Sequence, residues 1–207
     1  MLAHSGLHRG DERREFKLSN CRLLDSKIDG QAVKVMIIVI ERSKTNNYKR
    51  LEHSSFIRHM KPLECPIGSV ALFLFYLFNF TDEEFPNIFK REDWYDILLL
   101  FGDKGHKSKL DFSSHLKAVT KILNACEIES GKCKTHLQRK SVVRMLDELN
   151  CREDHVDRLG GWKSDKKTTS YLLNIATEAL KLMSGGSKVL GSYQVCRETF
   201  IPPIQLQ

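Results

Sequence analysis

The chain has 207 residues, of which 41% are hydrophobic and 29% are charged, and these values indicate one soluble globular domain over residues 1–207. Its longest apolar run, Val70–Phe78, is too short to cross a bilayer, which excludes a membrane-spanning protein. The net charge of +7 and the pI of about 9.1 suit a polyanionic partner, although a solvated basic surface without a partner has the same composition.

The first charged segment runs from Ser5 to Glu12. Arg9 and Glu12 stand three residues apart, so they share one face if the segment is helical. An exposed, charge-laced helix is the simplest interpretation of this segment taken alone.

Two strands follow, at Cys21–Asp25 and Ala32–Ile40, with a hairpin turn at Asp29-Gly30 between them. The second strand is rich in β-branched residues and long enough to be central in a sheet. A polar turn that contains Lys44 comes directly after it.

Pro66 is a good first residue for a helix, and the apolar stretch after it predicts a core helix that is buried on all sides. The sequence of residues 80–110 predicts a loop with a short strand or helix. Within it, residues 102–109 are expected to form a basic loop that contains glycine. Asp111 or Ser113 then caps a helix whose buried face comprises Leu116, Val119, Leu123 and Cys126.

The next helix carries the pair His136 and Arg139 on one face. Thr135 and Gln138 form a T-x-x-Q capping box, which predicts that the helix starts beside this pair. Asn150 ends it, and its core contacts are expected from Val142, Met145, Leu146 and Leu149.

A short helix over Arg152–Leu159 stops at Gly160-Gly161, and Trp162 follows at once. Tyr171 comes nine residues after Trp162. A further helix is expected beyond it, ending at Gly185-Gly186 and leaving residues 185–207 as a tail; its apolar positions are Ile175, Ala179, Leu180 and Met183.

The six cysteines include no C-x-x-C pair, and no secretory segment precedes them, so reduced core thiols inside the cell are the expectation. Cys133 with His136, and Cys151 with His155, leave a zinc site open as an alternative. The chain also lacks a P-loop, a G-x-G-x-x-G motif and an acidic metal pair. We therefore expect no cofactor and no metal.

The order and spacing of these motifs resemble the catalytic domain of the tyrosine recombinases, the phage-integrase family. The H-x-x-R box, the later Trp and Tyr, the Arg9–Glu12 box and the R-S-K-T context of Lys44 all have counterparts there. The K-T-N, R-H, C-P-I-G and F-I-P-P segments are similar to fungal Crypton-type recombinases and to the related fungal centromere-binding proteins. The resemblance extends from Ser5 to about Pro203.

The resemblance implies transfer of a DNA phosphodiester to a tyrosine hydroxyl. Arg9 and Arg139 would hold the non-bridging oxygens, because guanidinium forks bind such oxygens bidentately. His136 and the indole N–H of Trp162 would donate hydrogen bonds to the same oxygens.

Tyr171 would attack the phosphorus and form a 3′-phosphotyrosine, while Lys44 would protonate the leaving 5′ oxygen. Lys34, which lies within the second strand, is the rival candidate for the lysine. Glu12 would orient its neighbours.

The resemblance also implies a mainly α-helical α+β fold with a small antiparallel sheet near the N-terminus. The expected partner is double-stranded DNA in the nucleus, bound by a possible homo-oligomer. Family members carry a helical DNA-clamping domain before the Arg box, and only eight residues precede Arg9 here. The alternatives are a domesticated, non-catalytic DNA-binding module of the centromere-binding type, a truncated inactive remnant, and an intracellular scaffold.

Overall fold

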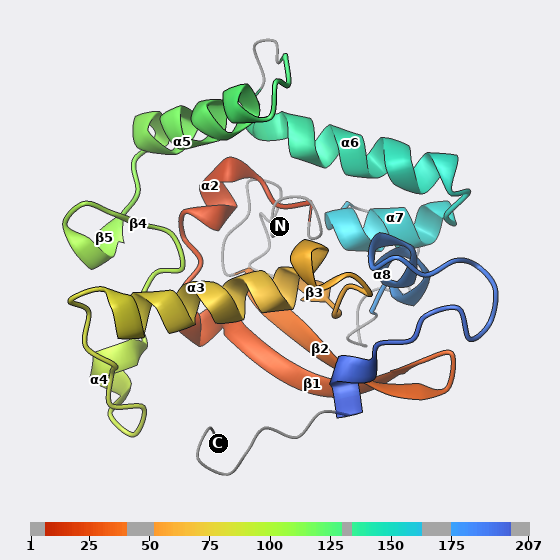
Figure 1. The fold of residues 1–207 in the computed structure, drawn as a ribbon, viewed down its shortest axis with the longest axis horizontal. Helices are drawn as coiled ribbons and strands as arrows, with labels where there is room; N and C mark the ends of the chain where they lie inside the picture. The colour runs from red at the N-terminus through yellow and green to blue at the C-terminus, as the bar shows by residue number, and fades with distance from the viewer. Residues whose placement is uncertain (1–6, 41–51, 130–133, 163–174, 200–207) are drawn as a thin grey trace.

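A three-stranded antiparallel sheet in the order β1-β2-β3 organises the computed structural model, which describes residues 7–40, 52–129, 134–162 and 175–199 (Figure 1). The fold is α+β, as predicted. Its elements in chain order are α2 Gly10–Arg13, η1 Leu18–Asn20, β1 Cys21–Ile28, β2 Gln31–Ile40, β3 Glu52–Phe56, η2 Pro62–Glu64, α3 Pro66–Phe80, α4 Arg91–Trp94, β4 Phe101–Gly102, β5 Gly105–Lys109, α5 Phe112–Ala125, α6 Lys134–Glu148, α7 Glu153–Gly160, α8 Thr177–Met183 and η4 Cys196–Thr199.

The hairpin between β1 and β2 forms where the sequence predicts it. Ile28 pairs with Gln31, so that Asp29 and Gly30 make a two-residue turn. Both turn residues have positive φ, 53° and 82°, as a type I′ turn requires. The first strand is longer than predicted and reaches Ile28 rather than Asp25.

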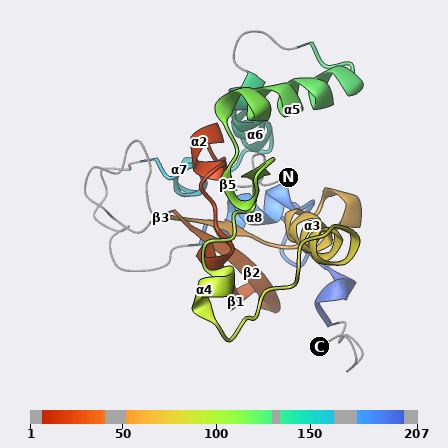
Figure 2. The same ribbon diagram turned by 90° about the vertical axis from the view of Figure 1, so that its left-hand side faces the viewer.

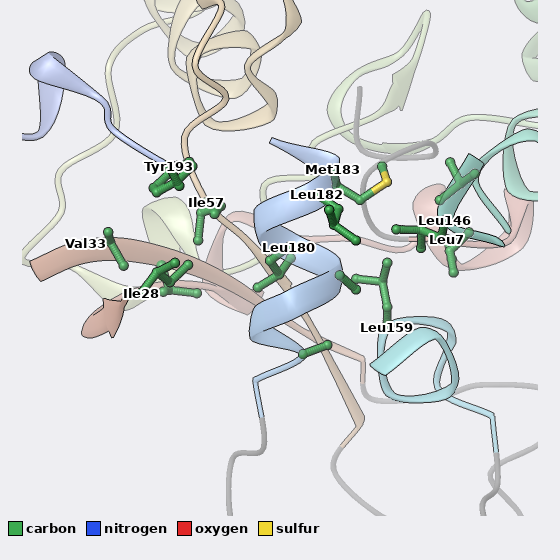
Figure 3. Close-up of a cluster of buried hydrophobic side chains, with 14 of the residues drawn as sticks. Leu7, Ile28, Val33, Ile57, Leu146, Leu159, Leu180, Leu182, Met183 and Tyr193 are labelled. Carbon is green, nitrogen blue, oxygen red and sulfur yellow. The ribbon is translucent and has the colours of Figure 1, made fainter. Parts of the chain in front are cut away.

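The central strand β2 is buried on both of its faces, which explains its nearly continuous apolar sequence. Its side chains alternate between two clusters. The first cluster includes Val33, Val35 and Ile37, and the second includes Met36, Ile38 and Ile40. Figure 3 shows the first cluster, in which side chains of α8 meet Leu7, Leu146 and Leu159. Helices α6 to α8 therefore cover one face of the sheet.

Helix α3 covers the other face, with Ile67, Val70 and Leu74 packed on the second cluster. The prediction that this helix is buried on all sides is wrong. The side chains along its outer side are strongly exposed: Leu72 70%, Phe75 58%, Tyr76 58% and Phe80 67%. Sequence periodicity cannot reveal how many layers will cover a helix, and the sheet covers α3 from one side only.

Asp111, rather than Ser113, caps helix α5. The Asp111 carboxylate accepts hydrogen bonds from the backbone N–H groups of Ser113, at 2.7 Å, and Ser114, at 3.1 Å. Its buried face differs from the predicted one, because Cys126 is exposed and Leu116 half-buried. The buried residues are His115, Val119 and Leu123.

Helix α6 already includes Lys134, so Thr135 lies inside it and the predicted capping box is wrong. Val142 and Leu146 are fully buried, as predicted, but Leu149 is 41% exposed. Asn150 adopts φ 54° and ends the helix, as predicted. Within the described residues, no helix combines the length and the apolar character that crossing a membrane requires.

The strand β3 was not among the predicted elements, and it pairs with the second half of β2. The loop expected at residues 102–109 instead contributes to a short β4–β5 pair. The helix expected after Tyr171 is present as α8, and its predicted apolar residues Ala179, Leu180 and Met183 are buried.

Candidate functional site

Arg139 on α6 is held by backbone and aromatic groups rather than by a carboxylate. Its Nη1 donates to the Leu7 carbonyl at 2.7 Å and its Nη2 to the Gly160 carbonyl at 3.2 Å. The guanidinium carbon lies 4.9 Å from the centre of the Trp162 ring, within cation–π range. Burial lowers the pKa of Arg139, and the nearby charge of Arg9 lowers it further. The two arginines therefore lie close enough to repel each other.

Arg9 immediately precedes α2 and is fixed through its backbone. Its N–H donates to the Glu12 carboxylate at 2.8 Å, and the same oxygen lies 3.8 Å from Nδ1 of the buried His8. Burial by itself would raise the pKa of Glu12, but its interaction with the nearby His8 and the hydrogen bond from the Arg9 N–H outweigh burial, and the pKa is lowered. Glu12 is therefore an ionised carboxylate that accepts from the Arg9 N–H at the start of α2.

The Arg9 side chain has spare hydrogen-bonding capacity. Its Nη1 is buried and has no hydrogen-bond partner among the described residues. A buried guanidinium N–H without an acceptor costs free energy, on the order of 1–3 kcal/mol or more for a charged group. Such a group is explained if an anion binds beside it.

Leu7 joins the N-terminal segment to Arg139. Its φ of 52° is left-handed, a conformation that costs a non-glycine residue roughly 1–2 kcal/mol. The side chain is 1% exposed and belongs to the first cluster, beside Leu146 and Leu159 (Figure 3). This packing and the hydrogen bond to Arg139 together stabilise the strained backbone.

The end of α7 positions Trp162. Gly161 has φ 62°, the Gly161 N–H bonds to the Arg158 carbonyl, and the Trp162 N–H bonds to the Asp157 carbonyl, which is a Schellman motif. The Trp162 ring lies against Gly160 so closely that a Cβ there would come within 2.8 Å of a ring atom. Gly160 thus leaves room for the indole beside Arg139, while Gly161 supplies the left-handed residue that ends the helix.

A cleft of about 800 Å³ lies between α6 and α7 and is lined by His136, Arg139 and Trp162 among others. The exposed side chains of Lys140 and Arg144 line it as well. These two residues were not among the predicted site residues, although their spacing of four and eight from His136 places them on one helix face.

The structure therefore brings together four of the predicted site residues, Arg9, Glu12, Arg139 and Trp162, and places His136 in the same cleft as the last two. Lys44 and Tyr171 lie outside the described residues. The rival Lys34 is exposed within β2 and pairs with Asp25 at 2.6 Å.

Three groups at this site were not found from the sequence: the carbonyls of Leu7 and Gly160, and the His8 side chain. Backbone acceptors carry no residue-type signal, since any residue supplies a carbonyl. His8 differs from an ordinary surface histidine only by its burial, which lowers its pKa despite the nearby Glu12 carboxylate.

No cluster of three metal-ligating side chains occurs among the described residues, and Cys133 lies outside them. Burial, aided by the charge of Glu178, raises the pKa of Cys151 to about 11. Cys151 and His155 belong to no group of three metal-ligating side chains among the described residues. The site instead offers guanidinium and indole donors, a combination that suits a tetrahedral oxyanion.

The sequence model of one protein family, described as centromere DNA-binding protein complex CBF3 subunit, domain 2, matches residues 1–206. No curated protein matches the chain. The family match confirms the centromere-binding side of the resemblance and extends over nearly the whole chain. The chain belongs to the family of domain 2 of the centromere DNA-binding protein complex CBF3 subunit.

Proposed function

We propose that this domain is a DNA-binding module of the centromere-binding type, which holds a backbone phosphate between Arg9 and Arg139. The main supporting observation is the buried Nη1 of Arg9, which has no acceptor among the described residues. The charge of Arg9 also acts on Arg139, whose hydrogen bonds go to two carbonyls, although the charge of Glu12 partly offsets the repulsion. A phosphate would supply acceptors to Arg9 and reduce the repulsion between the two guanidinium groups.

The charges in the cleft indicate where DNA would approach. The wall nearest the start of α6 is basic, with His136, Arg139 and Lys140, whereas Asp147, Glu153 and Asp157 line the cleft elsewhere. Phosphates are attracted to the first region and repelled by the second. The backbone should therefore cross the N-terminal end of α6 beside α2, and the net charge of +7 favours this approach.

The family membership supports this function, because the matching family is described as a centromere DNA-binding subunit. Binding to centromeric DNA would place the protein in the nucleus. Assembly of two or more copies on one DNA is a further part of the proposal, and the stoichiometry of the complex would test it.

The test is duplex-DNA binding by fluorescence anisotropy over a range of salt concentrations. The affinity should fall steeply with salt, with a log–log slope of about −0.9 per phosphate contact. Arg9→Met should weaken binding and reduce that slope by about one, because it removes one phosphate contact. The α2 backbone should be unaffected, since Glu12 is bound by the Arg9 N–H and not by its side chain.

Arg22→Met is the matched control, because Arg22 is an exposed residue of β1 and the substitution changes the net charge equally. It should leave the salt slope unchanged. Absence of binding at low salt would overturn the proposal in favour of a scaffold, and equal effects of the two substitutions would show that only overall charge matters.

A second candidate function, DNA strand transfer by a protein of Crypton-type recombinase descent, is favoured by one observation. Arg9, Glu12, Arg139 and Trp162 come from three separate parts of the chain and meet at one place. In this reaction the Tyr171 hydroxyl loses its proton to solvent and its oxygen bonds to phosphorus. The bond from phosphorus to the 5′ oxygen breaks, and Lys44 gives that oxygen a proton.

A nicked suicide DNA substrate tests this second function, with a helical DNA-clamping domain fused before the chain to raise affinity. A covalent protein–DNA adduct is expected, and Tyr171→Phe should abolish it while leaving DNA binding nearly intact. An adduct that survives Tyr171→Phe would mean a different nucleophile. Tight DNA binding without any adduct would leave the non-catalytic module as the function.

A further inference from the structure

A second cavity, apart from the Arg9–Arg139 site, lies where α2, α3 and α5 meet. Its volume is about 370 Å³, and its walls are largely apolar, with Phe16, Val70, Phe73, Leu99, Val119 and Ile122 among them. Each of these three helices contributes lining residues, and in Figure 1 α2 lies below α5 and above α3. The volume is at the lower end of the range for small-molecule pockets.

One cation lines this apolar cavity. Arg13 is only 7% exposed, and its Nη2 is buried without a hydrogen-bond partner among the described residues. The remaining contacts of the guanidinium are long, at 3.4 Å from Nε to the Arg9 carbonyl and 3.3 Å from Nη1 to the Gln138 side-chain oxygen. Arg13 is therefore a buried charge that neutral acceptors satisfy incompletely.

No other group that lines the cavity neutralises this charge. The described lining residues include no aspartate or glutamate. His115 is the other titratable residue there, and burial, with the charges of Arg13 and Arg14, lowers its pKa. Its Nδ1 lies 3.2 Å from Nη1 of Arg14, which can only donate, so Nδ1 accepts and the ring is neutral with its proton on Nε2.

We propose that this cavity binds a small carboxylic acid with an apolar body, such as a medium-chain fatty acid, whose carboxylate pairs with Arg13. The charges of Glu12 and Asp11 act on Arg13 from outside the cavity lining. A carboxylate inside the cavity would accept from the guanidinium in the fork geometry that arginine favours. The apolar body would be buried between α3 and α5. Ile122 is 61% exposed, so one wall lies at the surface and a ligand can reach the cavity there.

Calorimetric titration of the chain with octanoate tests the proposal, with octanol and butyrate as comparison ligands. Octanol has the apolar body without the charge, and butyrate has the charge with a shorter body. Octanoate should bind at least about tenfold more tightly than octanol, as expected for hydrogen bonds between charged groups. Equal binding of octanoate and octanol would overturn the proposal.

Two variants test the charged part and the apolar part of the cavity separately. Arg13→Met keeps an aliphatic chain of similar length and should remove the preference for octanoate over octanol. Ala118→Phe should abolish binding of both ligands, because Ala118 is an exposed lining residue of α5 and a ring there would fill the cavity. Arg22→Met, which makes the same charge change on β1, should alter neither.

Binding that survives Ala118→Phe would place the ligand elsewhere, for example on the exposed outer side of α3, and would overturn the assignment. If Arg13→Met fails to fold, the ratio of octanoate to octanol affinity in the unaltered chain, together with Ala118→Phe, still decides the question. A preference for octanoate that persists in folded Arg13→Met would also contradict the proposal.

Discussion

Two buried or half-buried cations in this domain are satisfied in opposite ways. Lys181 is 6% exposed, and its Nζ lies 2.5 Å from the Asp29 carboxylate and 2.7 Å from the Val189 carbonyl. Arg139 instead donates to two carbonyls and lies beside an indole ring, and no carboxylate of the described residues forms an ion pair with it. The first charge is neutralised within the fold, whereas the second remains available to an anionic ligand.

The two arrangements also differ in where they lie in the fold. The Lys181–Asp29 pair ties α8 to the β1–β2 turn, and the same carboxylate accepts from the Gly191 N–H at 2.9 Å. Arg139 joins the segment before α2 to the end of α7 and borders the cleft. A paired buried cation is a structural feature, and an arginine held by neutral groups is a candidate for function.

Removing the carboxylate of the Lys181–Asp29 pair should change the free energy of unfolding more than any other substitution proposed below. Asp29→Asn preserves the left-handed turn, which Asn tolerates, but leaves Lys181 buried without an anion. We expect it to lower the free energy of unfolding by about 3 kcal/mol, the low end for breaking a buried pair, because the amide oxygen can still accept. Chemical denaturation of the two proteins measures this difference.

The control is Asp25→Asn, which breaks the exposed pair with Lys34, whose side chain is 54% exposed. It should change stability by less than about 0.5 kcal/mol.

The pH dependence of stability follows from the ionisation of Asp29. The hydrogen bond from Lys181 lowers the pKa of Asp29. The pair therefore stabilises the fold fully above about pH 4, the unfolded pKa, and less as the pH falls through the lower folded value. A difference between Asp29→Asn and the unaltered chain that grows in acid would contradict this assignment.

Two adjacent glycines lie beside the Arg139–Trp162 contact, and replacing each with alanine should have a different effect. Gly161→Ala adds a Cβ with free space around it, but in a left-handed conformation, so it should cost about 1 kcal/mol of stability. Gly160→Ala places a Cβ within 2.8 Å of the Trp162 ring and should displace the ring from Arg139. Gly160→Ala should therefore weaken DNA binding more than Gly161→Ala, at a smaller cost in stability.

The chain has two tryptophans, so Trp162 fluorescence can be read in a Trp94→Phe background. A shift in emission is expected for Gly160→Ala and not for Gly161→Ala. If both variants shift the emission equally, the ring is positioned by the turn as a whole and not by its close contact with Gly160.

The sequence predicts those parts of the fold that depend on local backbone chemistry. The Asp29-Gly30 turn, the stop of α7 at Gly160-Gly161 and the end of α6 at Asn150 each rest on residues that favour positive φ. The outer side of α3 and the strand β3 depend on which elements cover or pair with them. That information is non-local, and the hydrophobicity of α3 is the same whether or not a layer covers its outer side.

The candidate site likewise combines features that the sequence predicts with features that depend on non-local contacts. Arg9 and Arg139 are separated by most of the chain, and only the motif spacing suggested that they meet. The contacts that hold Arg139 come from the Leu7 and Gly160 carbonyls, which no residue pattern encodes. The left-handed backbone of Leu7 has no local signal either, because it is imposed by packing in the first cluster.

The smallest effect should come from substitutions of Trp162, which are expected to weaken DNA binding only modestly. Two explanations compete for the role of this residue beside Arg139. The ring face lies over Arg139 and is 36% exposed, a setting in which a cation–π contact contributes about 0.5–1 kcal/mol, or roughly two- to fivefold in DNA affinity. Trp162→Leu removes both the aromatic face and the indole N–H, whereas Trp162→Phe keeps the face and removes the N–H. If Trp162 acts by orienting Arg139, phenylalanine should restore most of the DNA affinity that leucine loses, in the same anisotropy measurement. If the two variants lose equal affinity, the indole N–H binds the phosphate directly, which is the role that the recombinase resemblance implies.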